Sequence, residues 1–366
     1  MEGMRQRDSR IDLIRIFALF SVVSVHFFLN NGFYEQTVVG LRMFIMCVMR
    51  CFFMICVPLF MVLTGYLMCG KTISKKYYSR LIKTIVIYIL ASIVCLFFKE
   101  WYYKDKYSLL EMLLKICDFS AANYSWYIEM YIGLYMLIPF LNSLFNSLNS
   151  KKKIYLILTL IFVTSLPNIV NIWGNTDDLY AFQKIVPAYW LNLYPVTYYY
   201  IGSFIKNSKM KISTYRGIFS IVGLSVFLGF FCYLRSLHNV FIWGPWCDFN
   251  SPVILVLTII VFLLFLNVNT DNKCVKRCER IIKAISDSVL GAYLVSYIFD
   301  TVFYSILLKR VPIMTDRLNH YFVIVPTIIV CSIILSILLN IVYFCISIIL
   351  CNIRKLIDKL KRIEAY

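Results

Sequence analysis

The sequence predicts an all-α fold, a polytopic transmembrane bundle of about ten helices. Hydrophobic residues account for 61% of the 366 residues, and charged residues for only 15%. The mean hydropathy of +0.76 is far above that of a water-soluble domain, whose single core has no room for so much apolar surface. Apolar runs of about 20 residues, long enough to cross a hydrocarbon core of roughly 30 Å, also recur from one end of the chain to the other.

The apolar runs divide the chain into ten predicted spans, which we expect to form one membrane domain over residues 1–366 with no appended soluble domain. The first run follows a short basic N-terminus and has no small-residue cleavage site behind it, so we expect a retained helix rather than a removed signal. Pro58 predicts a break in the second span, which is longer than a straight crossing needs. The predicted spans are 11–29, 42–69, 79–98, 126–145, 153–172, 187–205, 217–235, 252–269, 288–308 and 322–350.

The positive charge of the chain is divided among the connectors between the apolar runs. Its net value is +18, but it does not form one basic face, so the sequence does not predict nucleic-acid binding. Most of the 37 Lys and Arg fall in the connectors on the side of the N-terminus and in the C-terminal tail. The positive-inside rule therefore predicts that both chain ends are cytoplasmic. In the longest outer connector, 99–125, an amphipathic stretch with Leu109, Leu110, Leu113 and Leu114 on one side predicts a helix on the membrane surface.

The cysteines do not predict a metal site. Most of the 13 cysteines lie inside apolar runs, where a thiol behaves as a small hydrophobe. Cys274 and Cys278 lie one helical turn apart in a connector, but they have no second pair of ligands nearby, as a structural zinc site requires. We therefore expect no bound metal.

A small set of ionisable residues falls at or inside the predicted spans. A charged side chain at the centre of a membrane helix costs about 2.5–3.5 kcal/mol even on the mildest scale. Each of these residues therefore needs a partner or a function. The set consists of Asp12, Arg15, His26, Arg50, Glu129 and Asp300.

Three members of this set form one polar stripe on the first predicted helix. Arg15 and His26 are eleven residues apart, which is three helical turns plus about 20°, and Asp12 lies one turn before Arg15. The stripe extends for about 16 Å, from the cytoplasmic boundary at Arg15 to the outer half of the membrane at His26. His26 is the one histidine that we place inside a span, and a histidine exchanges protons near neutral pH. Spacing alone leaves a second interpretation open, in which Asp12 and Arg15 mark the interface and His26 makes a single interhelical hydrogen bond.

Arg15, ten intervening residues and then His26 form a pattern that resembles the first helix of acyltransferase family 3. This family comprises bacterial membrane O-acyltransferases of surface polysaccharides. Other segments resemble motifs of the family and occur in the same order along essentially the whole chain. They are the Thr64-Gly65 ending of the second span, the basic loop 75–83, the segment from Trp126 to Pro139, and Tyr200-Ile201-Gly202.

One later segment departs from the family pattern. Residues 288–296 resemble a motif that in many members ends in a histidine, but Ser296 stands at that position. The resemblance therefore supplies no second catalytic histidine, and we assign Ser296 only a supporting role.

The resemblance implies an enzyme of the bacterial inner membrane that moves a short acyl group, above all acetyl, from cytoplasmic acyl-CoA to a hydroxyl. Acyl-CoA such as acetyl-CoA is then a co-substrate rather than a bound cofactor, and the acceptor is a surface polysaccharide or a lipid-linked glycan. His26 would act as general base on that hydroxyl, or accept the acyl group itself. Arg15, oriented by Asp12, would hold phosphates of the donor, because a guanidinium binds phosphate through two hydrogen bonds.

Further charged residues receive supporting roles in the same hypothesis. Lys75, Lys76 and Arg80 of the basic loop would add attraction for the donor, or they are solvated residues that only obey the positive-inside rule. Glu129 would orient His26 or balance the charge of Arg50. The sequence does not choose between these two pairings.

A transporter or flippase of glycan, or of a small polar solute, is the alternative from another functional class. Ten helices with buried charges suit transport as well as they suit catalysis. The sequence contains no internal repeat, and its motifs occur in the order of the acyltransferase family. These two observations favour the enzyme.

Overall fold

The computed structural model describes residues 7–170, 186–208, 210–270 and 272–363, and within these ranges the chain is all-α. Nine helical segments of this described part are long and apolar enough to cross a membrane. The only β contacts found in it are two isolated bridges, Thr37 with Val240 and Val38 with Leu237. The predicted fold class is therefore confirmed. Residues 171 and 172 of the fifth predicted span and the side chain of Cys274 lie outside the described part.

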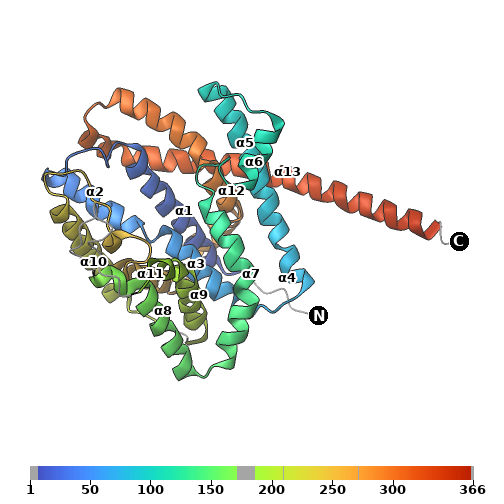
Figure 1. The fold of residues 1–366 in the computed structure, drawn as a ribbon, viewed down its shortest axis with the longest axis horizontal. Coiled ribbons are helices and arrows are strands. Elements are labelled where there is room, and N and C mark those ends of the chain that lie inside the picture. Colours follow the sequence, from blue (N-terminus) through green and yellow to red (C-terminus); the bar gives the residue numbers. More distant parts are fainter. Residues whose placement is uncertain (1–6, 171–185, 209, 271, 364–366) are drawn as a thin grey trace.

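Figure 1 shows the order of the helices, from the blue N-terminal end to the red C-terminal end. Three short 3-10 helices interrupt the connectors, η1 (Ala188–Leu193), η2 (Pro245–Cys247) and η3 (Met314–His320). The α-helices are α1 (Ser9–Asn30), α2 (Gly40–Phe53), α3 (Cys56–Met68), α4 (Lys75–Ser79), α5 (Leu81–Tyr103), α6 (Leu109–Cys117), α7 (Trp126–Ser147), α8 (Ser150–Val170), α9 (Tyr194–Ser208), α10 (Thr214–Arg235), α11 (Pro252–Leu266), α12 (Lys273–Arg310) and α13 (Tyr321–Ile363).

The second predicted span is broken, but the break precedes the proline. α2 ends at Phe53 and α3 begins at Cys56. Pro58 has no N–H, so the carbonyl of Met54, four residues earlier, has no helical donor. The helix is interrupted at that carbonyl, and Pro58 lies in the first turn of α3, where a proline is tolerated.

The sixth predicted span, 187–205, takes the form of η1 followed by α9. α9 has only 15 residues, about 22 Å of helix, so it is shorter than the hydrocarbon core and is not among the nine segments. It packs closely against α3 through one glycine on each helix. A Cβ at Gly65 would collide with the carbonyl of Tyr199, and a Cβ at Gly202 would collide with the carbonyl of Val62. This close approach of two backbones explains why a glycine stands at both positions.

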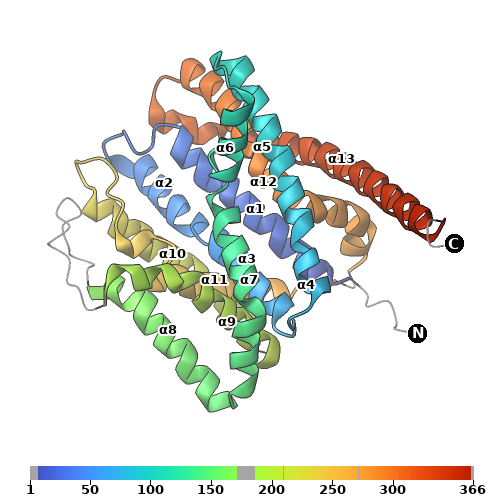
Figure 2. The same ribbon diagram turned by 45° about the vertical axis from the view of Figure 1, so that its right-hand side comes forward.

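α1 lies in the centre of the bundle, where it packs against α12, α3 and α13 (Figures 1 and 2). Helices cover it on several sides, so Ile14, Ala18 and Phe27 are fully buried. Asp12 and His26 are buried on the same helix. The predicted polar stripe therefore faces other helices of the protein.

α12 and α13 extend beyond the predicted spans. α12 begins at Lys273 rather than at 288, and α13 continues to Ile363 rather than ending at 350. The added segments are rich in Lys and Arg and contain neither Gly nor Pro, so they favour the continuation of a helix. The far end of α13 projects from the bundle towards the C-terminus (Figure 1).

The connector between α5 and α7 contains the predicted amphipathic helix, α6. Ser108 caps its N-terminus by accepting a hydrogen bond from the Glu111 N–H, and the Glu111 carboxylate accepts one from the Ser108 N–H. Leu109, Leu110 and Leu113 are all exposed. The placement of this helix on the membrane surface stays a prediction.

Candidate active site

The Arg15 end of α1 holds a cluster of paired charges. Asp12 is almost fully buried and accepts hydrogen bonds from Arg7 at 2.7 Å, from Ser286 Oγ at 2.7 Å and from Arg15 Nη1 at 3.2 Å. Arg7 also pairs with Asp287 at 2.8 Å, and its hydrogen bonds with Asp12 raise the pKa of its guanidinium. Arg15 donates a second hydrogen bond to Ser286 at 3.3 Å. Two guanidinium groups are thus balanced by two carboxylates, and Asp12 is in position to orient Arg15.

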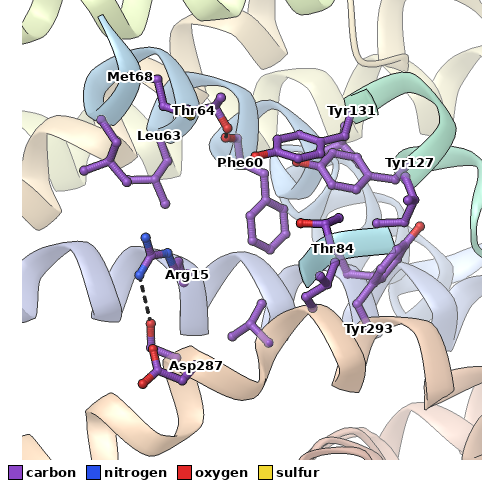
Figure 3. Close-up of a pocket in the computed structure, with 17 residues that line it drawn as sticks. Arg15, Phe60, Leu63, Thr64, Met68, Thr84, Tyr127, Tyr131, Asp287 and Tyr293 are labelled. Carbon is purple, nitrogen blue, oxygen red and sulfur yellow. Dashed lines mark hydrogen bonds between the residues drawn. The ribbon is translucent and has the colours of Figure 1, made fainter. Parts of the chain in front are cut away.

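A cavity of about 300 Å³ lies beside this cluster, between α1, α3, α5, α7 and α12. Arg15 and Asp287 form its charged side, and apolar or aromatic side chains form most of the remaining wall. Figure 3 shows Arg15 and Asp287 on one side of the cavity, and Phe60, Tyr127 and Tyr293 on the other. A cavity of this kind suits a ligand with a charged end and a long, mostly apolar arm.

At the other end of α1, His26 and Asp300 form a buried pair. His26 Nδ1 lies 3.1 Å from Asp300 Oδ2, and the two side chains are 11% and 1% exposed. Tyr124 donates to the same carboxylate oxygen at 2.9 Å, and its ring lies over the imidazole with 3.8 Å between the ring centres. Asn30, one turn after His26, donates to the hydroxyl of Tyr124. A carboxylate on Nδ1 favours the tautomer that leaves Nε2 available for proton transfer.

Two polar atoms of this second cluster have no hydrogen-bond partner among the described residues. They are Asp300 Oδ1 and the hydroxyl of Tyr304, both buried on α12. An unsatisfied buried polar group costs about 1–3 kcal/mol, so such groups call for an explanation. Asp300 and Tyr304 are four residues apart, so the two unsatisfied groups lie one turn apart on α12.

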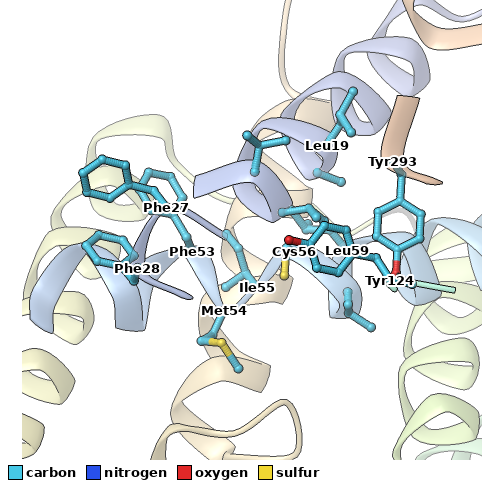
Figure 4. Packing of buried hydrophobic residues seen from close by; sticks show 14 of the residues in the cluster. Leu19, Phe27, Phe28, Phe53, Met54, Ile55, Cys56, Leu59, Tyr124 and Tyr293 are labelled. Carbon is cyan, nitrogen blue, oxygen red and sulfur yellow. Dashed lines mark hydrogen bonds between the residues drawn. The ribbon is translucent and has the colours of Figure 1, made fainter. Parts of the chain in front are cut away.

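The two clusters are connected through α12 and through Tyr293. α12 supplies Asp287 to the first cluster and Asp300 to the second, just as α1 contributes to both. Tyr293 lines the cavity and donates a hydrogen bond to the backbone carbonyl of Tyr124. Figure 4 shows Tyr124 and Tyr293 together among the packed core residues. The wall of the cavity therefore contacts the segment that holds Tyr124 against His26.

Arg50 belongs to a separate buried environment. Its guanidinium donates to the hydroxyl of Tyr34 at 3.1 Å and to the carbonyl of Cys247 at 2.8 Å. It also lies over the ring of Trp243, 4.1 Å from the ring centre. No carboxylate pairs with Arg50 among the described residues. Carbonyl and aromatic groups stabilise its charge instead.

Two of the predicted supporting residues do not contact His26. Glu129 lies on the exposed side of α7, so neither of its expected pairings, with His26 or with Arg50, is formed. Ser296 is fully buried, but its hydroxyl donates to a carbonyl one turn earlier in its own helix. Asp300, one turn after Ser296 on α12, supplies the side chain that contacts the histidine.

The basic residues Lys75, Lys76 and Arg80 are exposed at α4 and do not line the cavity. The segment that carries them connects Met68 with Thr84, and both of these residues do line it. Their position allows electrostatic attraction at a distance rather than direct contact with a ligand in the cavity.

In the His26 cluster, Asp300 and Tyr124 are the residues that sequence reasoning did not assign. Asp300 belonged to the set of charges in the spans, but no spacing connects it with His26, because the two are 274 positions apart and meet only when α1 and α12 pack. Its isolation inside a span was nevertheless a usable signal, since a buried carboxylate needs a partner. Tyr124 lies in a connector and carries neither a charge nor a motif, so the sequence offered no signal for it.

Comparison with known proteins identifies the family. A family model described as an acyltransferase domain matches residues 8–356, which is nearly the whole chain and includes the cavity, the His26 cluster and, except for Arg7, the Arg15 cluster. Comparison with curated proteins and with solved structures gave no significant match. The chain is therefore a multi-pass membrane protein with acyltransferase function, and it belongs to acyltransferase family 3.

Proposed function

We propose that this acyltransferase moves a short acyl group, acetyl in the simplest case, from acyl-CoA to a hydroxyl of a surface polysaccharide or lipid-linked glycan in the bacterial inner membrane. The observation that carries the proposal is the pair of clusters on α1, a histidine with its carboxylate at one end and an arginine beside a cavity at the other. They would supply the two groups that such a transfer needs, a base for the acceptor hydroxyl and a cation for the phosphates of the donor.

In this proposal His26 acts as a general base. Its Nδ1–H donates to Asp300, so Nε2 accepts the proton of the acceptor hydroxyl while that oxygen attacks the thioester carbonyl. The tetrahedral adduct then expels the CoA thiolate, which takes the proton back from Nε2. One ester bond forms and one thioester bond breaks. Asp300, held by Tyr124, stabilises the imidazolium that exists between the two steps.

Arg15 binds the donor in the same proposal. Asp12 and Ser286 hold its guanidinium at the cavity, where it is placed to receive phosphate oxygens. The pantetheine arm of the donor then lies along the cavity wall, with the thioester towards Tyr293 and His26. Arg15 and His26 are separated by about 16 Å of helix, so the donor has to bind in an extended form. The exposed basic loop around α4 adds attraction for the phosphates before they bind.

The test compares ester-linked acyl groups on surface polysaccharide, by mass spectrometry, in cells with no copy of the gene, with the natural gene and with His26→Ala. Membrane levels of the protein are matched by immunoblot. His320→Ala is the control, because His320 is an exposed histidine on η3. We expect acyl groups with the natural gene and with His320→Ala, and none with His26→Ala or with no copy.

Two results would contradict the proposal. Acylation that persists with His26→Ala would remove the histidine from the chemistry. Unchanged acylation together with loss of the surface glycan, in cells without the gene, would instead indicate a transporter or flippase.

A further inference from the structure

A second cavity lies at the His26 end of the bundle, away from the first. It has a volume of about 290 Å³ and is lined by Asn168 of α8, Leu191 of η1, and Trp243, Asp248 and Asn250 of the segment before α11. None of these residues lines the cavity at Arg15.

Two sets of contacts place the segment before α11 at the same end of the bundle as His26. The bridge of Val38 with Leu237 joins the start of the α10–α11 connector to the segment that follows α1. Further along this connector, the ring of Phe249 stacks on Trp126 with 5.8 Å between ring centres. Trp126 follows Tyr124, the ring over His26, by two residues. Phe249, which lies between two lining residues of the second cavity, therefore packs against the same short segment that holds Tyr124 over His26.

Polar groups in the second cavity lack partners. Asn168 is 3% exposed, and its Nδ2 has no hydrogen-bond partner among the described residues. Asp248 uses one carboxylate oxygen to accept from the N–H of Phe249 at 2.7 Å, and its other oxygen makes no hydrogen bond within the described part of the chain. A buried donor and a free acceptor that line one cavity are what a ligand with several hydroxyl groups satisfies.

An aromatic surface adjoins these polar groups. Trp243 is 45% exposed, and Tyr34 stacks on it with 5.5 Å between ring centres. Arg50 already lies over the Trp243 ring, so a second cation on this indole is disfavoured. Asp248 in the same cavity disfavours an anion by repulsion. A neutral ligand with hydroxyl groups for Asn168 and Asp248 and C–H groups for the indole suits all three side chains.

We propose that the second cavity is a carbohydrate subsite that binds one neutral sugar unit of a glycan. Trp243 provides the aromatic contact, Asn168 donates to a sugar oxygen, and Asp248 accepts from a sugar hydroxyl. The inference rests on the proposed function in one respect, the identification of that glycan as the acceptor. The sugar unit bound here would then be a different unit from the one whose hydroxyl reaches His26.

Saturation-transfer NMR tests the subsite without any catalysis. The full chain carrying His26→Ala is placed in lipid nanodiscs, because detergents with sugar headgroups would compete. The neutral trisaccharides maltotriose, cellotriose and tri-N-acetylchitotriose are titrated without acyl-CoA. Sorbitol is the control for non-specific polyol contact. Trp243→Ala and Asn168→Leu are compared with Trp101→Ala, which removes an indole that is 68% exposed but lies outside the cavity. Trp243→Phe retains an aromatic ring beside Arg50. Its comparison with Trp243→Ala shows whether the contact with Arg50 is needed for folding.

We expect saturation transfer to at least one trisaccharide but not to sorbitol, an apparent Kd at least tenfold higher with Trp243→Ala and with Asn168→Leu, and an unchanged Kd with Trp101→Ala. The apparent Kd of Trp243→Phe is expected to lie between those of the natural protein and Trp243→Ala. The subsite would be overturned if no trisaccharide showed saturation transfer, or if neither Trp243→Ala nor Asn168→Leu changed the apparent Kd. If cells showed acyl transfer but the second cavity bound no sugar, only the subsite would be rejected. If the second cavity bound sugar but cells showed no acyl transfer, only the proposed function would be rejected.

Discussion

The two ends of α1 differ in how far their charges are exposed. At the Arg15 end, the side chains of Arg7 and Arg15 are 34% and 32% exposed, and a cavity adjoins them. At the His26 end, His26 and Asp300 are 11% and 1% exposed, and no other ion pair of Asp300 is found among the described residues. One cluster is thus open and made of several charges, whereas the other is closed and made of one pair.

In the proposed function, this difference would separate donor binding at the Arg15 end from proton transfer at the His26 end. The guanidinium of Arg15 is partly exposed although its partner Asp12 is buried, so in the proposed function an arriving phosphate would share that guanidinium with Asp12. A buried pair experiences a lower dielectric, which strengthens its hydrogen bonds and fixes the imidazole before the substrate arrives. We therefore expect substitutions at the Arg15 end to change donor affinity, and substitutions at the His26 end to change the rate of the bound complex.

The largest effect is expected for Asp300→Asn, which keeps the shape of the side chain but removes its charge. Without the carboxylate, the imidazole is no longer fixed in one tautomer and the imidazolium is not stabilised. We expect kcat to fall by roughly 10²–10³-fold, while KM for acetyl-CoA stays within about threefold. The measurement is the rate of thiol release from acetyl-CoA by protein in nanodiscs, with the natural glycan as acceptor.

Asp287→Asn is the matched control, because it is the same substitution on the same helix at the other end of the bundle. It is expected to change KM for acetyl-CoA more than kcat, since Asp287 lines the cavity and pairs with Arg7. Equal losses of kcat with Asp300→Asn and Asp287→Asn would contradict the expected division between donor affinity at the Arg15 end and reaction rate at the His26 end.

Arg15→Lys is expected to have the next largest effect, on the donor side. Lysine keeps the positive charge but loses the planar fork that binds a phosphate through two hydrogen bonds and contacts Asp12 and Ser286. We expect KM for acetyl-CoA to rise about tenfold, with kcat within about threefold. Arg216→Lys, at an exposed arginine of α10, is the control in the same thiol-release assay. An unchanged KM would remove Arg15 from donor binding.

Tyr124→Phe is expected to have a smaller effect at the His26 end. The substitution removes one hydrogen bond to Asp300 but leaves the ring in place over the imidazole. One such bond contributes about 1 kcal/mol, so kcat is expected to fall about three- to tenfold. The control is Tyr215→Phe at a tyrosine that is 81% exposed. A loss as large as that of Asp300→Asn would mean that the phenol itself takes part in proton transfer.

The fold and one half of the site were predictable because they depend on local patterns. Apolar runs, the break near Pro58 and the polar stripe on α1 can all be recognised within a few helical turns of sequence. The partners of that stripe were not predictable in the same way. Asp300 reaches His26 only through the packing of α12 against α1, and nothing in the sequence sets the rotation of one helix about its axis relative to another. Glu129 shows the converse, because its helix was predicted but the direction of its side chain was not.

Glu129→Gln is expected to have the smallest effect and therefore tests the rotation of α7. The carboxylate is exposed and makes no ion pair with a described residue, so kcat and KM are expected to stay within about twofold in the thiol-release assay. The sequence alone allowed the opposite result, in which this carboxylate orients His26. A tenfold loss of kcat would mean that α7 turns Glu129 towards the bundle when substrates bind. Asp300 would then share the orientation of His26 with Glu129, which lies on the exposed side of α7 in the structure.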